Sequence, residues 1–202
     1  MPAARESLLD AACAALARHP WSAVRMVDVA AMAGVSRQTL YNEFGSKEGL
    51  GRALVRREAD GFLAGVERSL AAHTLAREQL AAAAEWTAST ARGNALVRAM
   101  LTGCWGERLP SPTLAAVPST ASAVPAQRRA DGPLPSPADL VAMVRDRAVA
   151  ALTGPGMGRA DVAELARSCE LVARLSVSCV SAPPGEGGAA ELVRLALPRR
   201  LR

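Results

Sequence analysis

The sequence predicts an all-α protein, with an N-terminal three-helix domain that contains a helix-turn-helix and a C-terminal helical domain. Half of the 202 residues are hydrophobic but only 3% are aromatic, because Ala, Leu and Val dominate. These residues recur every three or four positions, the period of one helix face, and alternating β-branched runs are almost absent. The length fits one or two domains.

The first helix is expected from about Arg5 to Arg18, with Leu8 and Ala12 on its inner side. Pro20 ends this helix, since a proline disfavours helical backbone in the residue before it. Trp21 is then expected to fill the gap between the first helix and the segment that follows.

Residues 26–44 have the pattern of two short helices joined by a tight turn. Apolar residues recur at helical spacing in MVDVAAMA, and Gly34 supplies the left-handed residue that ends this helix. Ser36 is placed to cap a second helix, Arg37–Phe44. Modules of this kind place their second helix in the major groove of DNA.

The second helix carries candidates for base recognition. Leu40 and Phe44 lie four residues apart and face the core, which leaves the polar residues on the other side. There, Arg37 can pair bidentately with guanine, and Gln38 or Asn42 with adenine. The alternative is an ordinary solvated helix face.

Further residues are candidates for contacts with the DNA backbone. Thr39 and Tyr41 suit phosphate oxygens, and Lys47 starts the next helix, where the helix dipole also favours a phosphate. Arg25 is another phosphate candidate, although it stands where a capping Ser, Thr or Asp is expected. Ser36 completes the set of expected DNA-binding residues.

The charge distribution gives mild support to an anionic partner. The formal net charge is +5, and residues 1–57 hold eight basic and five acidic side chains, an excess of three positive charges. Most of the net charge therefore lies in the N-terminal part. Basicity alone does not establish nucleic-acid binding.

The rest of the chain is expected to form a helical body, connected by a long helix from Lys47 to about Ala71. We therefore divide the chain into domains 1–46 and 47–202. Further helices are expected at Leu75–Ala91, Asn94–Trp105, Ala138–Leu152, Ala160–Ser181 and Ala189–Leu197. Residues 107–137 contain seven prolines, which predicts a flexible loop with a short helical turn near Pro112–Val117. This loop is either dispensable or a flap over a ligand.

The N-terminal residues resemble the TetR/AcrR family of bacterial transcriptional regulators. The family pattern stands here as Val29-Ala30, Ala33-Gly34-Val35-Ser36, Thr39-Leu40-Tyr41, Phe44 and Ser46-Lys47-Glu48-Gly49-Leu50. The resemblance runs from about Leu8 to Leu54 and departs from the pattern at Arg25, where the family often has Ser or Thr. It implies a homodimer with a C-terminal ligand-binding and dimerisation domain, in which a small molecule releases the protein from its operator. The last two helices usually build the dimer interface.

One face of the penultimate helix is the candidate dimer interface, because apolar and small side chains recur along it at helical spacing. The residues concerned, with two from the last helix, are Val162, Leu165, Cys169, Val172, Ser176, Leu192 and Leu195. Packing of this stripe against the protomer's own core is the alternative. We favour the interface because two operator half-sites need two N-terminal domains held about one turn of DNA apart.

An apolar or amphipathic small molecule is the expected effector, since Trp and Met side chains on the body helices can form adaptable apolar walls. The candidates are Trp86, Met100, Cys104, Trp105 and Met143. These residues are equally compatible with plain core packing. The expected mechanism is a population shift, in which the ligand tilts the long helix from Lys47 and lowers affinity for a palindromic operator.

Other classes of protein find little support. We expect no enzyme, cofactor or metal, because the sequence has no Ser-His-Asp spacing, no P-loop and only two histidines, and its four cysteines form no CxxC pair. No secretory signal and no run of about 18 apolar residues is present, so we expect a cytoplasmic protein with no membrane partner. A helix-turn-helix scaffold that binds a protein partner without ligand control is the alternative function.

Overall fold

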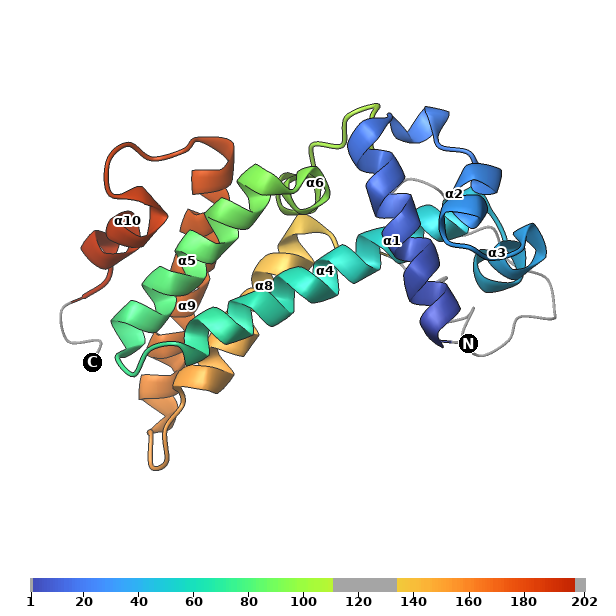
Figure 1. Cartoon of the computed structure of the whole chain (residues 1–202). Helices are drawn as coiled ribbons and strands as arrows, with labels where there is room; N and C mark the ends of the chain where they lie inside the picture. The colour runs from blue at the N-terminus through green and yellow to red at the C-terminus, as the bar shows by residue number, and fades with distance from the viewer. Residues whose placement is uncertain (1, 111–133, 199–202) are drawn as a thin grey trace. The chain divides into compact units, whose positions relative to one another are not determined.

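The structure is a computed structural model that describes residues 2–110 and 134–198. Within these ranges every regular element is a helix and no strand occurs, so the all-α prediction is confirmed. Two compact units are present: an N-terminal unit of Met1–Glu58 and Trp105–Leu134, and a body unit of Ala59–Cys104 and Pro135–Arg202 (Figure 1). Most of the expected 107–137 loop, including the turn expected near Pro112–Val117, lies outside the described residues.

In its described residues, the N-terminal unit contains three helices, one 3-10 turn and the first part of a long helix. They are α1 (Pro2–Arg18), η1 (Trp21–Ala23), α2 (Met26–Met32), α3 (Arg37–Phe44) and α4 (Lys47–Ala71). α1 packs on both α2 and α3. Leu8, Val29 and Leu40 are completely buried, and Trp21 is also buried, as expected from the sequence. These apolar side chains hold the helix-turn-helix against α1.

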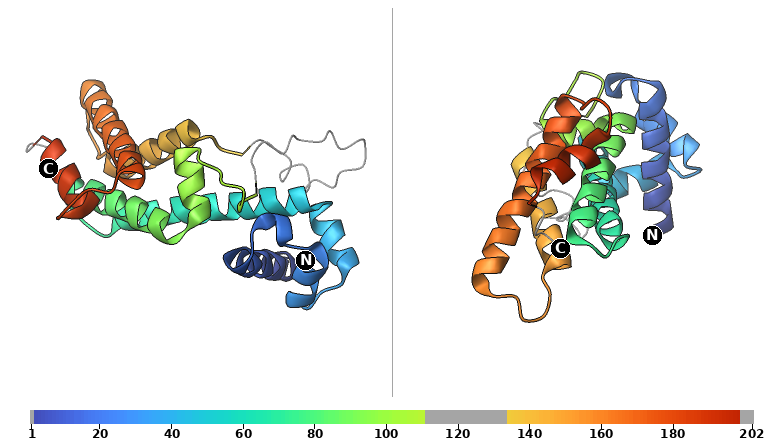
Figure 2. Two further views of the ribbon diagram at one scale, coloured as in Figure 1. Left: turned by 90° about the horizontal axis from the view of Figure 1, so that it is seen from above. Right: turned by 90° about the vertical axis from the view of Figure 1, so that its left-hand side faces the viewer.

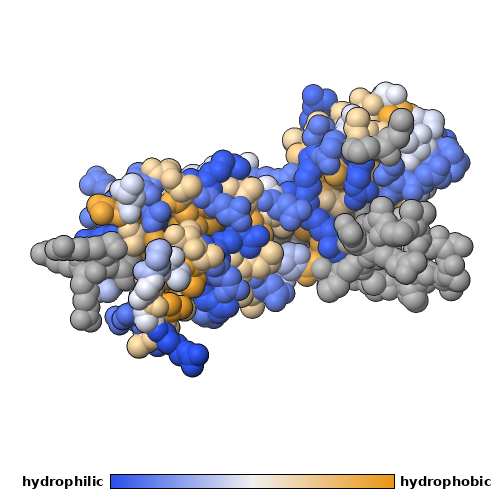
Figure 3. Space-filling view, turned by 90° about the horizontal axis from the view of Figure 1, so that it is seen from below, coloured by the Kyte–Doolittle hydropathy of each residue, from blue (hydrophilic) through white to orange (hydrophobic). Residues whose placement is uncertain are grey.

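The body unit consists of the second part of α4 and further helices. In the described residues these are α5 (Ala76–Gly93), α6 (Ala95–Thr102), α8 (Pro137–Leu152), α9 (Arg159–Ser181) and α10 (Gly188–Ala196). α9 packs against α5, α6, α8 and α10, and α5 packs against α10 as well (Figure 2). Leu80, Met100 and Leu140 are buried in the core that these helices enclose. On the molecular face in Figure 3, hydrophilic side chains surround several apolar patches.

α6 ends earlier than the expected Trp105. Gly103 has a φ of +73°, a left-handed conformation that favours glycine, and its N–H bonds the carbonyl oxygen of Ala99 at 2.8 Å. This hydrogen bond closes the helix. The apolar residues beyond the glycine are what extended the predicted helix too far.

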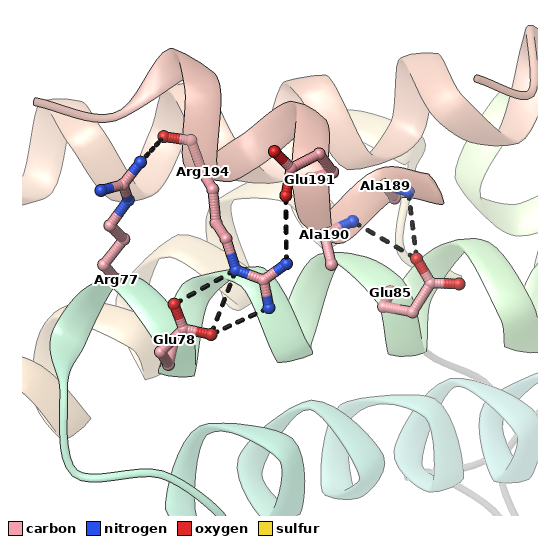
Figure 4. Close-up of polar contacts among 7 residues, drawn as sticks. All are labelled: Arg77, Glu78, Glu85, Ala189, Ala190, Glu191 and Arg194. Atoms are coloured by element: carbon pink, nitrogen blue, oxygen red, sulfur yellow. Dashed lines mark hydrogen bonds and ion pairs between the residues drawn. The ribbon is translucent and has the colours of Figure 1, made fainter. Parts of the chain in front are cut away.

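The start of α10 is capped by a side chain from another helix. Its N-cap residue is Gly187, which has no side chain to offer. Instead, Glu85 of α5 accepts hydrogen bonds from the backbone N–H groups of Ala189 and Ala190, at 3.0 and 3.3 Å (Figure 4). A carboxylate at a helix N-terminus satisfies free donors and opposes the positive end of the helix dipole. Glu85 therefore fixes α10 on α5.

A second contact between α5 and α10 joins the start of α5 to the end of α10. Arg194 donates to the two carboxylate oxygens of Glu78, with its Nη2 at 2.8 Å from Oε2, and Arg77 donates to the backbone carbonyl of Arg194 (Figure 4). The Arg194 guanidinium holds the pKa of Glu78 below its ordinary value. The stabilisation from this contact is therefore complete at neutral pH and is lost as the pH falls through that lowered pKa.

Substitution of Glu85 by alanine should loosen α10. Loss of a cap costs about 1 kcal/mol, so the free energy of unfolding in urea should fall by roughly that amount. Exchange of the Ala189 and Ala190 amide protons should become faster than in the wild type. Glu186→Ala is the control, because Glu186 is exposed and close to the same helix. Equal amide exchange in the two variants would contradict the assignment of Glu85 as the cap.

Candidate DNA-binding interface

The turn between α2 and α3 has the backbone geometry that its sequence predicts. Gly34 has a φ of +67°, and its N–H donates to the carbonyl oxygen of Ala31 at 3.2 Å. The backbone N–H of Val35 donates to the carbonyl oxygen of Ala30 at 3.0 Å. These two bonds form a Schellman motif, which ends α2 and sets the direction in which α3 begins.

The first turn of α3 is held by Ser36. Its hydroxyl oxygen accepts the backbone N–H of Thr39 at 3.0 Å, which confirms the predicted cap. The two hydroxyl oxygens of Ser36 and Thr39 also lie 2.8 Å apart and share a hydrogen bond. Both residues were expected to contact DNA, and in the structure both stabilise the end of the helix that carries the other candidates.

The two faces of α3 differ as expected from the sequence. Leu40 and Phe44 are buried against the unit's core. The opposite face exposes Arg37, Gln38, Tyr41 and Asn42. The side chains of Arg37 and Tyr41 have no hydrogen-bonding or ionic partner among the described residues, so both are available to a ligand.

Gln38 and Asn42 are joined to each other. The Gln38 side-chain nitrogen donates to the Asn42 side-chain oxygen at 2.8 Å. Residues four apart on a helix are neighbours, so the spacing of Gln38 and Asn42 in the sequence is compatible with this hydrogen bond. The bond orients two side chains whose amides can each pair with adenine.

Arg5 has a role in the structure that the sequence pattern does not indicate. This residue of α1 places its guanidinium 4.7 Å from the centre of the Phe44 ring and 3.7 Å from a carboxylate oxygen of Glu43. It also donates to the Glu43 backbone carbonyl at 3.5 Å. Arg5 thus supports the C-terminal end of α3, where a positive charge also suits the helix dipole.

The corner between α3 and α4 requires a glycine. A Cβ atom at Gly49 would lie 1.9 Å from the carbonyl oxygen of Phe44, so no other residue fits without movement of the backbone. Ser46 caps α4 by accepting the Gly49 N–H at 3.1 Å. This close approach fixes the angle at which α4 leaves the helix-turn-helix.

Lys47 lies at the start of α4, as expected, but its side chain folds onto η1. Its ammonium nitrogen donates to the carbonyl oxygen of Ser22 at 3.1 Å and lies 5.5 Å from the centre of the Trp21 ring. Burial lowers the pKa of Lys47 from its ordinary value. An ammonium has three donors, so hydrogen-bonding capacity for a phosphate remains.

Arg25 occupies the N-cap position of α2 and provides no side-chain cap there, as its sequence position predicted. Its guanidinium pairs with Asp28, with Nε 2.8 Å from one carboxylate oxygen and Nη2 3.0 Å from the other. These bonds hold the pKa of Asp28 below its ordinary value. A phosphate contact by Arg25 would therefore have to compete with the Asp28 carboxylate.

The expected ligand residues do not line the cavity found in the body unit. This cavity is small, with room for about one water molecule, and part of it is open to solvent. Its walls are Phe62, Thr87, Leu101, Leu140, Val141, Val144, Ala173, Ser176 and Val177. It lies within the helical packing of the body and is almost entirely apolar.

Each of the five ligand candidates lies outside the wall of this cavity. Met100 is buried in the core and Met143 is half-buried outside the cavity wall. Trp86 covers Gly65, and its indole N–H donates to the Phe62 carbonyl at 3.3 Å. Cys104 is exposed, and Trp105 belongs to the N-terminal unit.

The expected dimer residues also divide into two groups. One group is buried within the protomer and packs against its own core, as in the alternative given for the stripe. It consists of Leu165, Cys169, Val172 and Ser176. Burial raises the pKa of the Cys169 thiol to about 12. Val162 is half-buried, whereas Leu192 and Leu195 are exposed. Only the residues of the second group can reach a partner without rearrangement of the core.

The described residues were also compared with the requirements of a metal site and of a membrane-spanning helix. Within residues 2–110 and 134–198, no three His, Cys, Asp or Glu side chains are grouped as metal ligands would be. In the same ranges, no helix combines the length and apolar character that a membrane span requires.

This geometry is similar to that of known proteins. Residues 8–54 match the family model for bacterial regulatory proteins of the tetR family. The HTH-type transcriptional regulator AlkX from Mycobacterium tuberculosis (strain ATCC 25618 / H37Rv) is 48% identical over 69 residues, which are 34% of this chain and 33% of AlkX. This chain therefore matches about a third of that relative's length.

Two solved structures are similar over almost the whole chain. The TetR family repressor AlkX from Dietzia sp. strain DQ12-45-1b is 26% identical, with a TM-score of 0.55 and coverage of 94% of this chain and 91% of that one. A TetR-family transcriptional regulator from Streptomyces coelicolor shares the fold at 13% identity, with a TM-score of 0.54 and coverage of 96% and 77%. Residues 8–54 of the chain are therefore similar to the bacterial regulatory proteins of the tetR family, and the fold of the whole chain is similar to that of TetR-family structures.

Proposed function

We propose that the protein is a sequence-specific DNA-binding transcriptional regulator that represses from a palindromic operator. The observation that carries this proposal is the exposed polar face of α3, where Arg37 and Tyr41 lack partners among the described residues and Gln38 orients Asn42. Residues 1–46 form the DNA-binding domain in this proposal, and residues 47–202 form the regulatory and dimerisation domain.

The exposed residues divide into those that recognise bases and those that position the protein. Arg37 has the donor geometry for guanine, and the linked amides of Gln38 and Asn42 suit adenine. Tyr41 and Lys47 are placed for phosphate oxygens, which fix the register on the duplex. Ser36 and Thr39 contribute by holding the first turn of α3.

Titration of a fluorescently labelled duplex over a range of salt concentrations tests DNA binding. The affinity should fall linearly on a plot of log affinity against log salt, because each neutralised phosphate releases counterions. A protein that binds no duplex at any salt concentration would contradict the proposal. It would favour the alternative of a scaffold for a protein partner.

In this proposal the protein acts as a homodimer through its last two helices. Leu171 of α9 and Leu195 of α10 are 50% and 74% exposed, and Leu192 is also exposed. Large aliphatic side chains on two packed helices favour burial against a second copy of this chain. Two copies would place two α3 helices on two operator half-sites.

The effector in this proposal is a small apolar or amphipathic molecule that enters at the body cavity and widens it, since the cavity in this structure has room for about one water molecule. Seven of the nine wall residues are hydrocarbon side chains, and the hydroxyl groups of Thr87 and Ser176 are the polar exceptions. The similar AlkX from Dietzia is described as implicated in biodegradation of n-alkanes, which also favours an aliphatic ligand. Binding would change the operator affinity only if the ligand prefers one conformation of the protein.

The two cavity hydroxyls favour an aliphatic ligand that carries a hydrogen-bond donor. Thr87 and Ser176 each donate to a carbonyl of their own helix, at 2.8 and 2.7 Å, so their oxygens are left as acceptors. Thr87→Val should weaken binding of 1-octanol about 2- to 10-fold, the loss of one hydrogen bond. Fluorescence of the adjacent Trp86 measures it, with Thr90→Val as the control in the same helix. Equal affinities of the wild type and Thr87→Val for 1-octanol would contradict a hydrogen bond from the ligand to Thr87.

A further inference from the structure

The segment Trp105–Pro110, here called the strap, belongs to the N-terminal unit although it follows the body helix α6. Its anchor is a backbone hydrogen bond, in which the N–H of Trp21 donates to the carbonyl oxygen of Arg108 at 2.8 Å. Trp21 lies far away in sequence, between α1 and α2. The chain thus returns to the DNA-binding unit after it has entered the body.

The end of the strap is packed against α4. Pro110 is buried, and a Cβ atom at Gly51 would lie 3.0 Å from the Pro110 Cβ and 3.1 Å from Trp21 Cζ2. Both distances are shorter than ordinary van der Waals contact, so the absence of a side chain at Gly51 is what allows the two rings to approach α4. The strap and Trp21 therefore meet at one point of this helix.

Trp21 connects this point to Lys47. The Lys47 ammonium lies over the indole ring, at 5.5 Å from its centre, and bonds the carbonyl of the neighbouring Ser22 at 3.1 Å. A cation held over an aromatic ring loses freedom but keeps its charge. The position of Trp21 thus determines where the ammonium group lies at the start of α4.

We propose that the strap is a second connection from the body to the DNA-binding unit, in addition to α4, and that Trp21 is the positioning residue through which it acts on Lys47. Leu101 of α6 lines the body cavity, and only a short segment separates it from Arg108. A change at the cavity wall therefore has a covalent route to the phosphate contact. This inference rests on the proposed DNA-binding function.

The test compares two glycines of the same helix. Gly51→Ala adds a methyl group against Pro110 and Trp21, whereas Gly61→Ala adds it where nothing lies within 4 Å, so both gain the same helix propensity. Gly51→Ala should accelerate exchange of the Trp21 amide proton at least about tenfold, and Gly61→Ala should not. Equal exchange rates in the two variants would overturn the anchoring of the strap.

A second measurement follows the effect on Lys47. With a plain 30-base-pair duplex, Gly51→Ala should make the log–log salt slope shallower by about one for each phosphate that Lys47 no longer neutralises, and Gly61→Ala should leave the slope unchanged. In a Lys47→Ala background, Gly51→Ala should have no further effect on the slope. An unchanged slope, or an additive effect in that background, would overturn the route through Lys47.

Failure of the underlying function has a separate signature. A wild-type protein without salt-dependent duplex binding would contradict the proposed function, and amide exchange alone would then decide whether the strap is anchored. If Gly51→Ala does not fold, Pro110→Ala replaces it, since it removes the packed ring and leaves α4 intact. Rapid exchange of the Trp21 amide in Pro110→Ala supports the proposal, and wild-type exchange overturns it.

Discussion

Arg37→Ala should reduce operator affinity by roughly 30-fold or more. A bidentate arginine–guanine pair contributes about 1–3 kcal/mol, and a dimer loses one such pair at each half-site. The substitution should leave the fold intact, because the Arg37 side chain is exposed and makes no hydrogen bond or ion pair to other described residues. Fluorescence anisotropy with a labelled operator duplex measures the loss.

The pattern of loss distinguishes base recognition from a general charge effect. Arg37→Ala should abolish the preference for one base in each half-site, whereas removal of a phosphate-binding side chain weakens binding to all sequences equally. Arg98→Ala is the matched control, since Arg98 is an exposed arginine of the body helix α6. Equal losses in the two variants would show that Arg37 acts only through its charge.

Leu195→Glu should convert the protein from a dimer to a monomer. Leu195 is 74% exposed in the protomer, and burial of a leucine in an interface is worth about 1.5–3 kcal/mol. By symmetry a dimer contains two copies of this contact, and a buried unpaired carboxylate adds a further penalty. The dimer dissociation constant should therefore rise at least about 100-fold, as measured by light scattering over a dilution series.

Loss of the dimer should also weaken operator binding, because two linked DNA-binding domains bind more tightly than one. Leu75→Glu is the control, since Leu75 is 56% exposed at the start of α5, outside α9 and α10. A Leu195→Glu variant that keeps the wild-type mass would move the interface away from α10. If Leu195→Glu and Leu75→Glu have the same mass in solution, the exposed face of α9 and α10 has no support as the dimer interface.

The helix-turn-helix could be predicted from sequence because its determinants are local. The Schellman turn at Gly34 and the Ser36 cap each involve residues within five positions of one another. The same holds for the spacing of Leu40 and Phe44, which assigned the buried face of α3 correctly. Short-range hydrogen bonds and helix periodicity leave few alternatives for such a segment.

The faces of the body helices could not be predicted in the same way. Periodicity identified an apolar stripe on α9, but it does not say whether that stripe meets a second protomer or helices of the same chain. Cys169 and Val172 proved to be buried in the protomer. The contacts of Arg5 with Glu43 and of Trp21 with Arg108 join residues distant in sequence, and no local signal indicates such pairs.

Selection of bound duplexes from a random DNA pool, followed by sequencing, tests sequence-specific recognition by a dimer most directly. We predict one enriched palindrome, with two related half-sites separated by about one turn of DNA. The half-sites should contain a guanine whose enrichment disappears with Arg37→Ala. A pool without any enriched sequence, with a protein that is folded and dimeric, would contradict sequence-specific recognition.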